Sequence, residues 1–231
     1  MSYKDNLSNV EAKIIEACNR AGRKRDSVQL IAVSKTKPNE AISEIYDCGI
    51  RDFGENKVQE MAGKMAELHS DINWHLIGHL QRNKVKYIAE KVEMIHSVDS
   101  YRLAEEINIQ AKKFNRIIPV LIEVNVAEEQ TKFGVRCDDV LQLVKDISEL
   151  ENVRVKGLMT IAPNVVVAEE NRPIFRKLKQ LSVDIAAENI DNISMNLLSM
   201  GMTNDFEVAI EEGATHIRVG TAIFGDRYYN K

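Results

Sequence analysis

Short apolar runs alternate with longer amphipathic stretches along the whole chain. Eight of the short runs are rich in β-branched residues, as is typical of buried parallel strands. They cover residues 28–34, 50–54, 74–78, 94–98, 118–125, 153–159, 193–200 and 215–220. The stretches between them repeat apolar residues at helical spacing, as Leu103, Ile107 and Ala111 do after Asp99-Ser100. The pattern therefore predicts strands and helices in strict alternation.

The number of these units decides between two architectures. Eight strands, each followed by a helical segment, are the count of a (β/α)8 barrel, whose usual size is roughly 250 residues. An open doubly wound sheet normally has fewer strands and a glycine-rich first turn, and no G-x-G-x-x-G follows the first strand here. We predict a single-domain (β/α)8 TIM-type barrel over residues 1–231. An extra N-terminal helix, with Val10, Ile14, Ala17 and Ala21 on one side, precedes it.

Composition and charge exclude several classes of protein. With 44% hydrophobic and 29% charged residues, the chain is typical of a globule with a large core. A net charge of −4 gives no reason to expect nucleic acid as a partner, and three cysteines predict neither a disulfide framework nor a thiolate metal site. The polar N-terminus carries no signal core and no stretch is long enough to span a membrane, so we expect a cytoplasmic protein.

Lys35 is the first candidate for chemistry, because it follows a buried strand. A lysine at that position has its ammonium near apolar walls, which disfavours the charged form and leaves more neutral amine to attack a carbonyl carbon. The alternative is that the side chain extends to solvent and does nothing chemical. In a barrel, active residues gather at the carboxyl ends of the strands, and Asn56 follows the second strand in the same way.

The segments after the last two strands predict a phosphate site. One reads Ser199-Met200-Gly201-Met202-Thr203-Asn204 and the other Gly220-Thr221. Glycines let backbone N–H groups approach a ligand, and helix N-termini favour an anion. The loops after strands seven and eight are the usual phosphate site of such barrels. Either glycine alone would be no more than a turn residue, but two such loops together favour phosphate.

Two other features are candidate ligand sites. Arg218 lies between apolar residues on the last strand, so its charge needs an acceptor, which is either a core carboxylate or a ligand at the barrel mouth. His75 and His79 are four residues apart, but on a strand this separates them by roughly 13 Å. We therefore expect no metal site.

Several ordered motifs together resemble one family. The chain is similar to the pyridoxal phosphate homeostasis proteins, relatives of the N-terminal barrel of alanine racemase, over nearly its whole length. The segments that carry the resemblance are Ala32-Val33-Ser34-Lys35, Phe53-Gly54-Glu55-Asn56, Trp74-His75-Leu76-Ile77-Gly78, Leu80-Gln81-Arg82-Asn83-Lys84, Gly157-Leu158-Met159, Leu198-Ser199-Met200-Gly201-Met202-Thr203 and Arg218-Val219-Gly220.

The resemblance implies pyridoxal 5'-phosphate (PLP) as the cofactor and assigns its contacts. Lys35 would form a Schiff base with PLP, and Asn56 would lie beside it. Arg218 would face the pyridine nitrogen, where a permanent cation disfavours protonation and weakens PLP as an electron sink. The phosphate would be held by Ser199, Gly220 and Thr221 with nearby backbone amides, including the loop at Gly201.

Three functions compete, and the first is favoured. It is a monomeric PLP-binding protein for PLP homeostasis, which buffers the cofactor or delivers it to apo PLP enzymes with little or no turnover and no catalytic residue. The second, an amino-acid racemase, needs a base on the other face of the substrate. The related racemase takes this second base from a second domain. A chain that ends at Lys231 leaves no room for that domain, and we expect Tyr228 and Tyr229 to be surface anchors. The third, a Schiff-base aldolase, typically has its lysine on a later strand.

Overall fold

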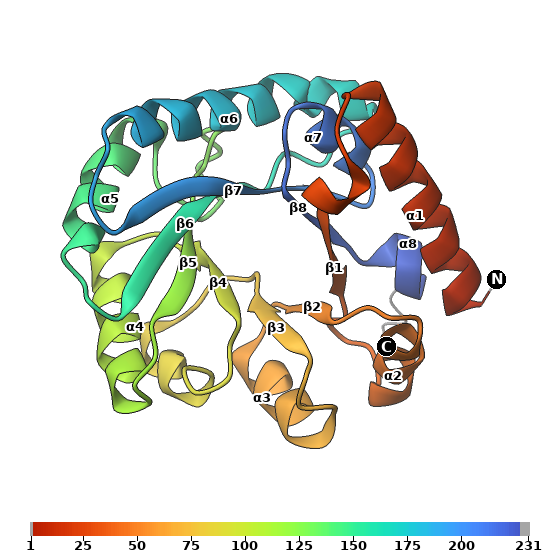
Figure 1. The fold of residues 1–231 in the computed structure, drawn as a ribbon, viewed down its shortest axis with the longest axis horizontal. Helices are drawn as coiled ribbons and strands as arrows, with labels where there is room; N and C mark the ends of the chain where they lie inside the picture. Colours follow the sequence, from red (N-terminus) through yellow and green to blue (C-terminus); the bar gives the residue numbers. More distant parts are fainter. Residues whose placement is uncertain (1, 227–231) are drawn as a thin grey trace.

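Eight parallel strands close into a barrel in the order β1 to β8, with β8 pairing back onto β1. This computed structural model describes residues 2–226 (Figure 1). Tyr228 and Tyr229 lie outside the described residues. The strands are β1 (Gln29–Val33), β2 (Asp52–Glu55), β3 (Asn73–Leu76), β4 (Met94–Val98), β5 (Ile118–Glu123), β6 (Val153–Met159), β7 (Ile193–Met202) and β8 (His216–Val219). All eight predicted strands are present, so the predicted barrel is confirmed.

The helices lie around the outside of the barrel (Figure 1). They are α1 (Tyr3–Arg20), α2 (Asn39–Asp47), α3 (Val58–Glu67), α4 (Tyr101–Lys113), α5 (Val140–Ser148), α6 (Arg172–Ala187), α7 (Phe206–Glu211) and α8 (Thr221–Phe224). Between β3 and β4 the chain forms a 3₁₀ helix, η2 (Arg82–Tyr87), in place of an α-helix. None of the helices within residues 2–226 is long and apolar enough to cross a membrane.

The extra helix α1 packs one apolar face onto the barrel. Val10, Ile14 and Ala17 are buried as the sequence predicts, whereas Ala21 lies just beyond the last helical residue and is half-buried. Ser2 begins the helix with a capping box, in which its side chain and that of Asp5 each accept a backbone N–H bond. Each fully buried aliphatic side chain contributes roughly 1.5–3 kcal/mol to stability.

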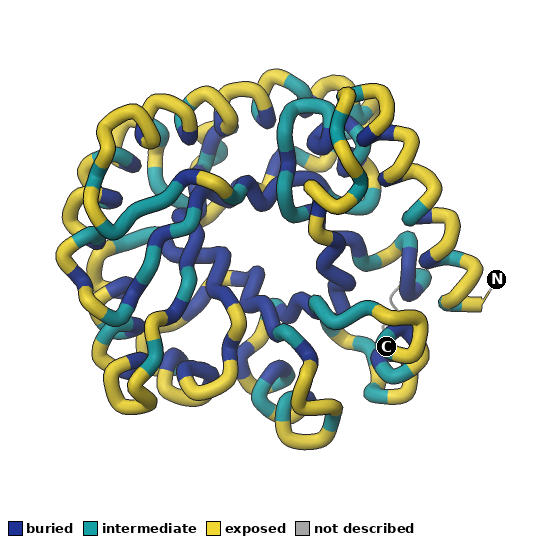
Figure 2. Tube along the Cα trace, viewed as in Figure 1, coloured by how far each residue is buried: buried dark blue, intermediate teal, exposed yellow. Residues whose placement is uncertain are grey.

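Burial follows the layers of the barrel. Figure 2 shows buried residues along the strands and on the inward sides of the helices, with exposed residues on the outward sides. Only β4 and β6 end at the predicted residue, and two of the other differences matter for the site. β5 stops at Glu123, because Asn125 exchanges hydrogen bonds with Glu129 in a turn, and β7 runs on to Met202. Both differences change which side chains reach the mouth of the barrel.

Candidate functional site

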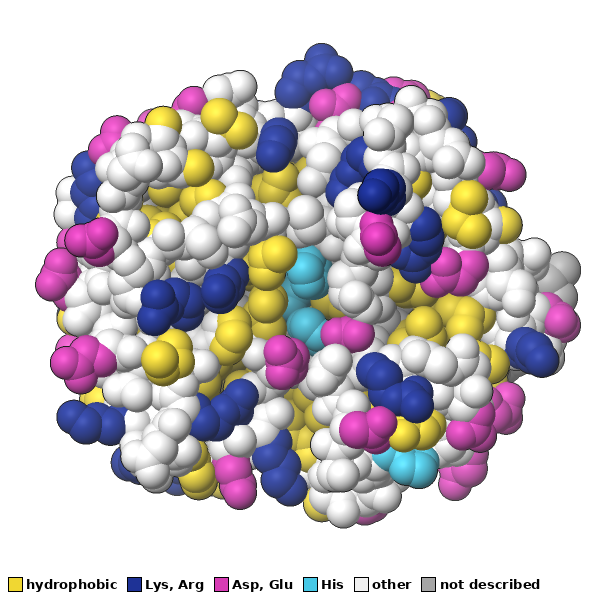
Figure 3. Space-filling view, in the orientation of Figure 1, with side chains coloured by type: hydrophobic (Ala, Val, Ile, Leu, Met, Phe, Trp, Pro, Cys, Tyr) yellow, Lys and Arg dark blue, Asp and Glu magenta, His cyan; other side chains and the backbone are white. Residues whose placement is uncertain are grey.

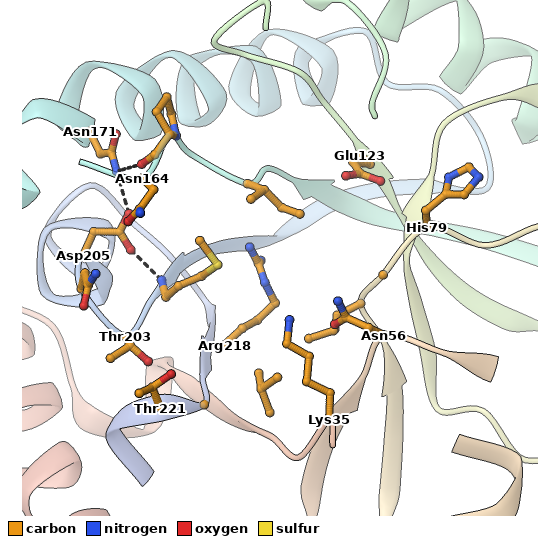
Figure 4. Close-up of a pocket in the computed structure, with 18 of the residues that line it drawn as sticks. Lys35, Asn56, His79, Glu123, Asn164, Asn171, Thr203, Asp205, Arg218 and Thr221 are labelled. Carbon is orange, nitrogen blue, oxygen red and sulfur yellow. Dashed lines mark hydrogen bonds between the residues drawn. The ribbon is translucent and has the colours of Figure 1, made fainter. Parts of the chain in front are cut away.

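A cavity of about 710 Å³ lies at the carboxyl ends of the strands. Residues that follow β1, β2, β3, β5, β6, β7 and β8 line it, together with residues at the ends of β1, β5, β7 and β8 (Figure 4). The sequence predicts seven residues at this site. The cavity lining includes Lys35, Asn56, Arg218, Gly220 and Thr221.

Lys35 lies two residues beyond β1, is half-buried, and extends its side chain into the cavity (Figure 4). The backbone beneath it is anchored by a buried ion pair. Lys64 donates to the carbonyl oxygen of Ser34 (2.9 Å) and to the carboxylate of Glu55 (2.8 Å). The Ser34 hydroxyl also donates to Glu55 (2.6 Å). These contacts fix the point from which Lys35 projects.

The sequence does not predict this ion pair, because it places Glu55 only in a segment at the rim. Glu55 is fully buried, and burial raises the pKa of its carboxyl while Lys64 opposes the rise. Replacing one partner of such a pair leaves a buried charge without compensation. The feature of the sequence that could have indicated the ion pair is Lys64. This lysine lies on the apolar side of α3, where Val58 and Met61 are also buried.

Asn56 follows β2 directly and approaches the chain after β3 very closely. A Cβ atom on Gly78 would lie 2.6 Å from the Asn56 carbonyl oxygen and 2.8 Å from its Cα atom. Only glycine allows this approach, so Gly78 holds Asn56 at the cavity wall.

One end of the cavity carries two hydroxyl groups. Thr203 and Thr221 lie beside each other in Figure 4, on the loops after β7 and β8. The β7 loop is shaped by Asp205, whose carboxylate accepts from the backbone N–H of Met202 (2.7 Å) and from the amide of Asn171 (2.8 Å). The two loops meet at this end of the cavity, as the sequence predicts.

Two of the residues predicted to hold the phosphate, Ser199 and Gly201, do not line the cavity. Ser199 is fully buried inside the barrel, where its Oγ accepts from Arg218 (2.6 Å) and contacts Nδ1 of His96 (2.9 Å). Gly201 has φ +89°, and a Cβ atom there would lie 2.5 Å from Cβ of Ala209. Both lie within β7, outside the cavity lining. Gly201 is therefore needed for packing of α7, and Thr203 is the hydroxyl at the cavity.

Arg218 is a buried cation at the cavity floor, with 4% of its surface exposed. Its second terminal nitrogen donates to the carbonyl oxygen of Thr160 (2.8 Å). Burial lowers the pKa of Arg218 to about 10, so the side chain stays charged at neutral pH. None of the ion pairs within residues 2–226 includes Arg218, but the charges of Glu123 and Asp205 oppose the fall in its pKa.

The opposite end of the cavity is acidic and aromatic, and the sequence does not reveal it. Glu123 is 5% exposed, and its Oε2 has no hydrogen-bond partner among the described residues. Burial, with a contribution from Asp99, raises the pKa of Glu123 to about 7. The ring of His79 stacks on Phe133 with centroids 3.8 Å apart, and its Nδ1 lies 3.6 Å from Asp99.

The two histidines of the possible metal pair lie in different places. His75 is buried in the barrel interior, while His79 lines the cavity. In the described part of the chain, no group of three or more His, Cys, Asp or Glu side chains could hold a metal ion.

The barrel is closed, a lysine follows its first strand, and hydroxyl groups follow its last two strands. These features define the class of protein, and residues 6–228 match the alanine racemase N-terminal domain family. A pyridoxal phosphate homeostasis protein from Aquifex aeolicus is 49% identical over 99% of this chain and 100% of its own. A structure of PipY from Synechococcus elongatus, with PLP bound, is 39% identical with a TM-score of 0.81, covering 92% of this chain and 100% of that one. The chain belongs to the pyridoxal phosphate homeostasis protein family.

Alanine racemase from Clostridium difficile shares the fold at much lower identity. It is 15% identical with a TM-score of 0.73, and the match covers 99% of this chain and 58% of the racemase. At that identity the likeness shows the barrel alone.

Proposed function

We propose that this protein binds PLP at the mouth of the barrel and serves PLP homeostasis, buffering or delivering the cofactor with little or no turnover. One observation carries the proposal. Lys35, near the start of the chain, converges on one cavity with Thr203, Arg218 and Thr221, near its end. The names of the full-length relatives and the PLP bound to PipY support it.

The residues present fit the cofactor. Ligand sites commonly enclose roughly 300–1,000 Å³, and the cavity of about 710 Å³ exceeds the needs of PLP alone. Lys35 supplies the amine for covalent attachment. Thr203 and Thr221 hold the phosphate, with backbone N–H groups at Gly220 and the start of α8, which have no partner within the helix. When bound, PLP supplies an aldehyde carbon and an electron-withdrawing ring.

In this proposal Arg218 and Asn56 have the roles that the family resemblance implies. Arg218 would face the ring nitrogen of bound PLP, where its charge would disfavour protonation. An unprotonated ring withdraws electrons less strongly, so a cation at this place suits a carrier better than an enzyme that must stabilise a carbanion. Asn56 borders the cofactor from the end of β2.

The remaining cation in the lining, Lys37, donates to backbone carbonyl oxygens. Its ammonium donates to the carbonyl oxygens of Phe224 (2.9 Å), Gly225 (3.1 Å) and Asp226 (3.0 Å). These three hydrogen bonds hold the Lys37 side chain at the chain segment that follows α8. Among the described residues that line the cavity there is no tyrosine.

The second candidate function is an amino-acid racemase, and Glu123 is the observation that favours it. A carboxyl with a pKa of about 7 at a cavity wall suits a general base near neutral pH. A carrier and a racemase differ in whether the α-proton of an amino acid exchanges.

Two measurements test the proposal. Borohydride reduction of the PLP-loaded protein, followed by mass spectrometry, should fix PLP on Lys35; a label on Lys37, Lys57 or Lys84 would contradict the assignment. Loss of α-deuterium from L- and D-amino acids should then be orders of magnitude slower than the roughly 10 turnovers per second of a median enzyme. Rapid exchange, abolished by Glu123→Gln, would establish the racemase.

We further propose that the chain is a single-domain monomer of the cytoplasm that passes PLP to apo PLP enzymes. Sedimentation at several concentrations tests the monomer. Transfer is tested by adding PLP-loaded protein to an apo-enzyme and following recovery of its activity, with free PLP at the same concentration as the control. Recovery no faster than with free PLP would limit the function to storage.

A further inference from the structure

A chain of polar side chains crosses the interior of the barrel and ends at Arg218. Arg218 Nη1 donates to Ser199 Oγ (2.6 Å), which lies 2.9 Å from His96 Nδ1. His96 Nε2 lies 2.9 Å from His75 Nδ1, and His75 Nε2 lies 2.9 Å from Asp52 Oδ1. We call these five residues the interior chain. They come from β8, β7, β4, β3 and β2, so five strands contribute one member each.

The chemistry of the two ends gives this chain one direction. A guanidinium can only donate, so Ser199 Oγ accepts from Arg218. The buried hydroxyl then needs an acceptor for its own proton, and Nδ1 of His96 is the acceptor within reach. With Nδ1 accepting, a neutral His96 carries its proton on Nε2.

The remaining two hydrogen bonds, which lead to the carboxylate of Asp52, have the same direction. His96 Nε2–H donates to His75 Nδ1, and His75 therefore carries its own proton on Nε2, from which it donates to Asp52. Burial, followed by the neighbouring His75, His216 and Arg218, keeps the pKa of His96 well below its usual range, which is consistent with a neutral ring. Every bond in the chain then points from the cation toward the carboxylate.

A row of hydrogen-bonded polar side chains, such as the interior chain, is unusual inside a barrel of this fold. The interior of this fold is normally packed with branched apolar side chains. Buried polar groups are costly unless all of them are satisfied, and a satisfied network fixes a single arrangement. His75, His96, Ser199 and Arg218 are all buried, whereas Asp52 keeps 17% of its side chain exposed. Histidine side chains are visible in the central hollow of the barrel, next to an acidic side chain, in Figure 3.

We propose that Asp52, His75, His96 and Ser199 are positioning residues that fix the orientation and donor strength of the Arg218 guanidinium at the cofactor ring. This inference rests on the proposed function, because it assumes that PLP binds with its ring nitrogen at Arg218. Ser199 and the Thr160 carbonyl each hold one terminal nitrogen and set the plane of the guanidinium. The carboxylate at the far end polarises each bond between it and the cation.

The first test uses the protein without cofactor. Nitrogen NMR of labelled histidines should find both His75 and His96 neutral, with the proton on Nε2. In Ser199→Ala, His96 loses the donor to Nδ1 and its signals should change. His69→Gln is the control, since His69 is exposed, stacks on Tyr46 and takes no part in the interior chain. A proton on Nδ1 of His96 in the unaltered protein would overturn the proposal.

The second test follows the bound cofactor. PLP labelled at its ring nitrogen should show a change in the pKa of that nitrogen on the order of one unit in Ser199→Ala. Asp52→Asn should give a smaller change in the same direction, because the amide oxygen still accepts but carries no charge. His69→Gln should give none. Asp52 is partly exposed and the substitution is isosteric, so this variant supplies the test if Ser199→Ala does not fold.

The outcomes separate this inference from the proposed function. If the histidine signals behave as expected but PLP does not bind, the proposed function fails. Binding of PLP with the same ring-nitrogen pKa in Asp52→Asn, Ser199→Ala and the unaltered protein would show that the interior chain is only structural.

Discussion

The mouth of the barrel and its interior both carry hydroxyl groups, but the hydroxyl groups of the two regions have different surroundings. Thr203 and Thr221 lie at the cavity, on loops that follow β7 and β8. Ser199, on the strand that leads into the first of these loops, is buried between Arg218 and His96. A hydroxyl at the mouth is available to a ligand, while a hydroxyl in the interior is committed to other side chains.

The difference separates binding from positioning. Removing a hydroxyl at the mouth costs the contact with the ligand and leaves the fold intact. Removing one in the interior leaves a buried partner unsatisfied, at about 1–3 kcal/mol of folding stability. Affinity for PLP and stability of the protein should therefore respond to different substitutions, and four predictions test this separation.

The largest effect on PLP affinity is expected at the end of the cavity where we propose that the phosphate binds. Thr203→Val with Thr221→Val preserves shape and removes two hydrogen bonds to a charged oxygen, each worth roughly 1.5–3 kcal/mol. PLP affinity should fall by roughly 10²–10⁴-fold, as measured by titrating the apo-protein, with the unfolding transition nearly unchanged. Thr131→Val, at an exposed position outside the cavity lining, is the control. An unaltered affinity in the double variant would move the phosphate elsewhere on the rim.

The next effect concerns pH and Glu123. Its pKa is raised from 4.5 to about 7 in the folded protein, so the folded state binds the proton more tightly than the unfolded state. Stability is full below pH 4.5 and falls as the pH rises to 7, by about 3 kcal/mol in total. Glu123→Gln should remove this dependence, so urea unfolding of the two apo-proteins across that range should diverge. Parallel curves would mean that the carboxyl is ionised in the folded state at little cost.

The strand positions and much of the mouth are predictable from the sequence because the carboxyl ends of all strands meet at one rim. That rule alone places Lys35, Asn56, Arg218 and Thr221 at the cavity. It does not show that Thr203 lines the cavity in place of Ser199, because β7 runs two residues further than its apolar run indicates. The loop therefore begins later, and the hydroxyl at the cavity belongs to Thr203.

The interior could not be predicted, because it depends on the registers of strands far apart in sequence. Asp52 and His75 lie on neighbouring strands, but Ser199 reaches His96 across the barrel from 103 residues away. A histidine inside an apolar run indicates only that some partner must exist. The same holds for Glu123, where nothing in the sequence indicates that its Oε2 is buried without a partner.

A smaller effect on affinity is expected from Lys35→Ala. The substitution removes covalent attachment, but the phosphate contacts and Arg218 are separate groups and remain. PLP should still bind non-covalently, and more tightly than to the double threonine variant, when both are titrated under the same conditions. Lys57→Ala, on an exposed residue outside the lining, should keep the borohydride label. Complete loss of PLP binding in Lys35→Ala would mean that attachment supplies most of the affinity.

The smallest effect on affinity, and the sharpest separation of the two regions, is expected for Ser199→Ala. Its hydroxyl does not line the cavity, so PLP affinity should fall less than about tenfold, which corresponds to about 1.4 kcal/mol. Stability should nevertheless fall by about 1–3 kcal/mol, because His96 and Arg218 each lose a buried partner. Thr203→Val should show the reverse pattern, with reduced affinity and little change in urea unfolding. If Ser199→Ala instead weakens PLP binding as much as Thr203→Val while leaving stability unchanged, Ser199 contacts the phosphate after all and the division between mouth and interior is wrong.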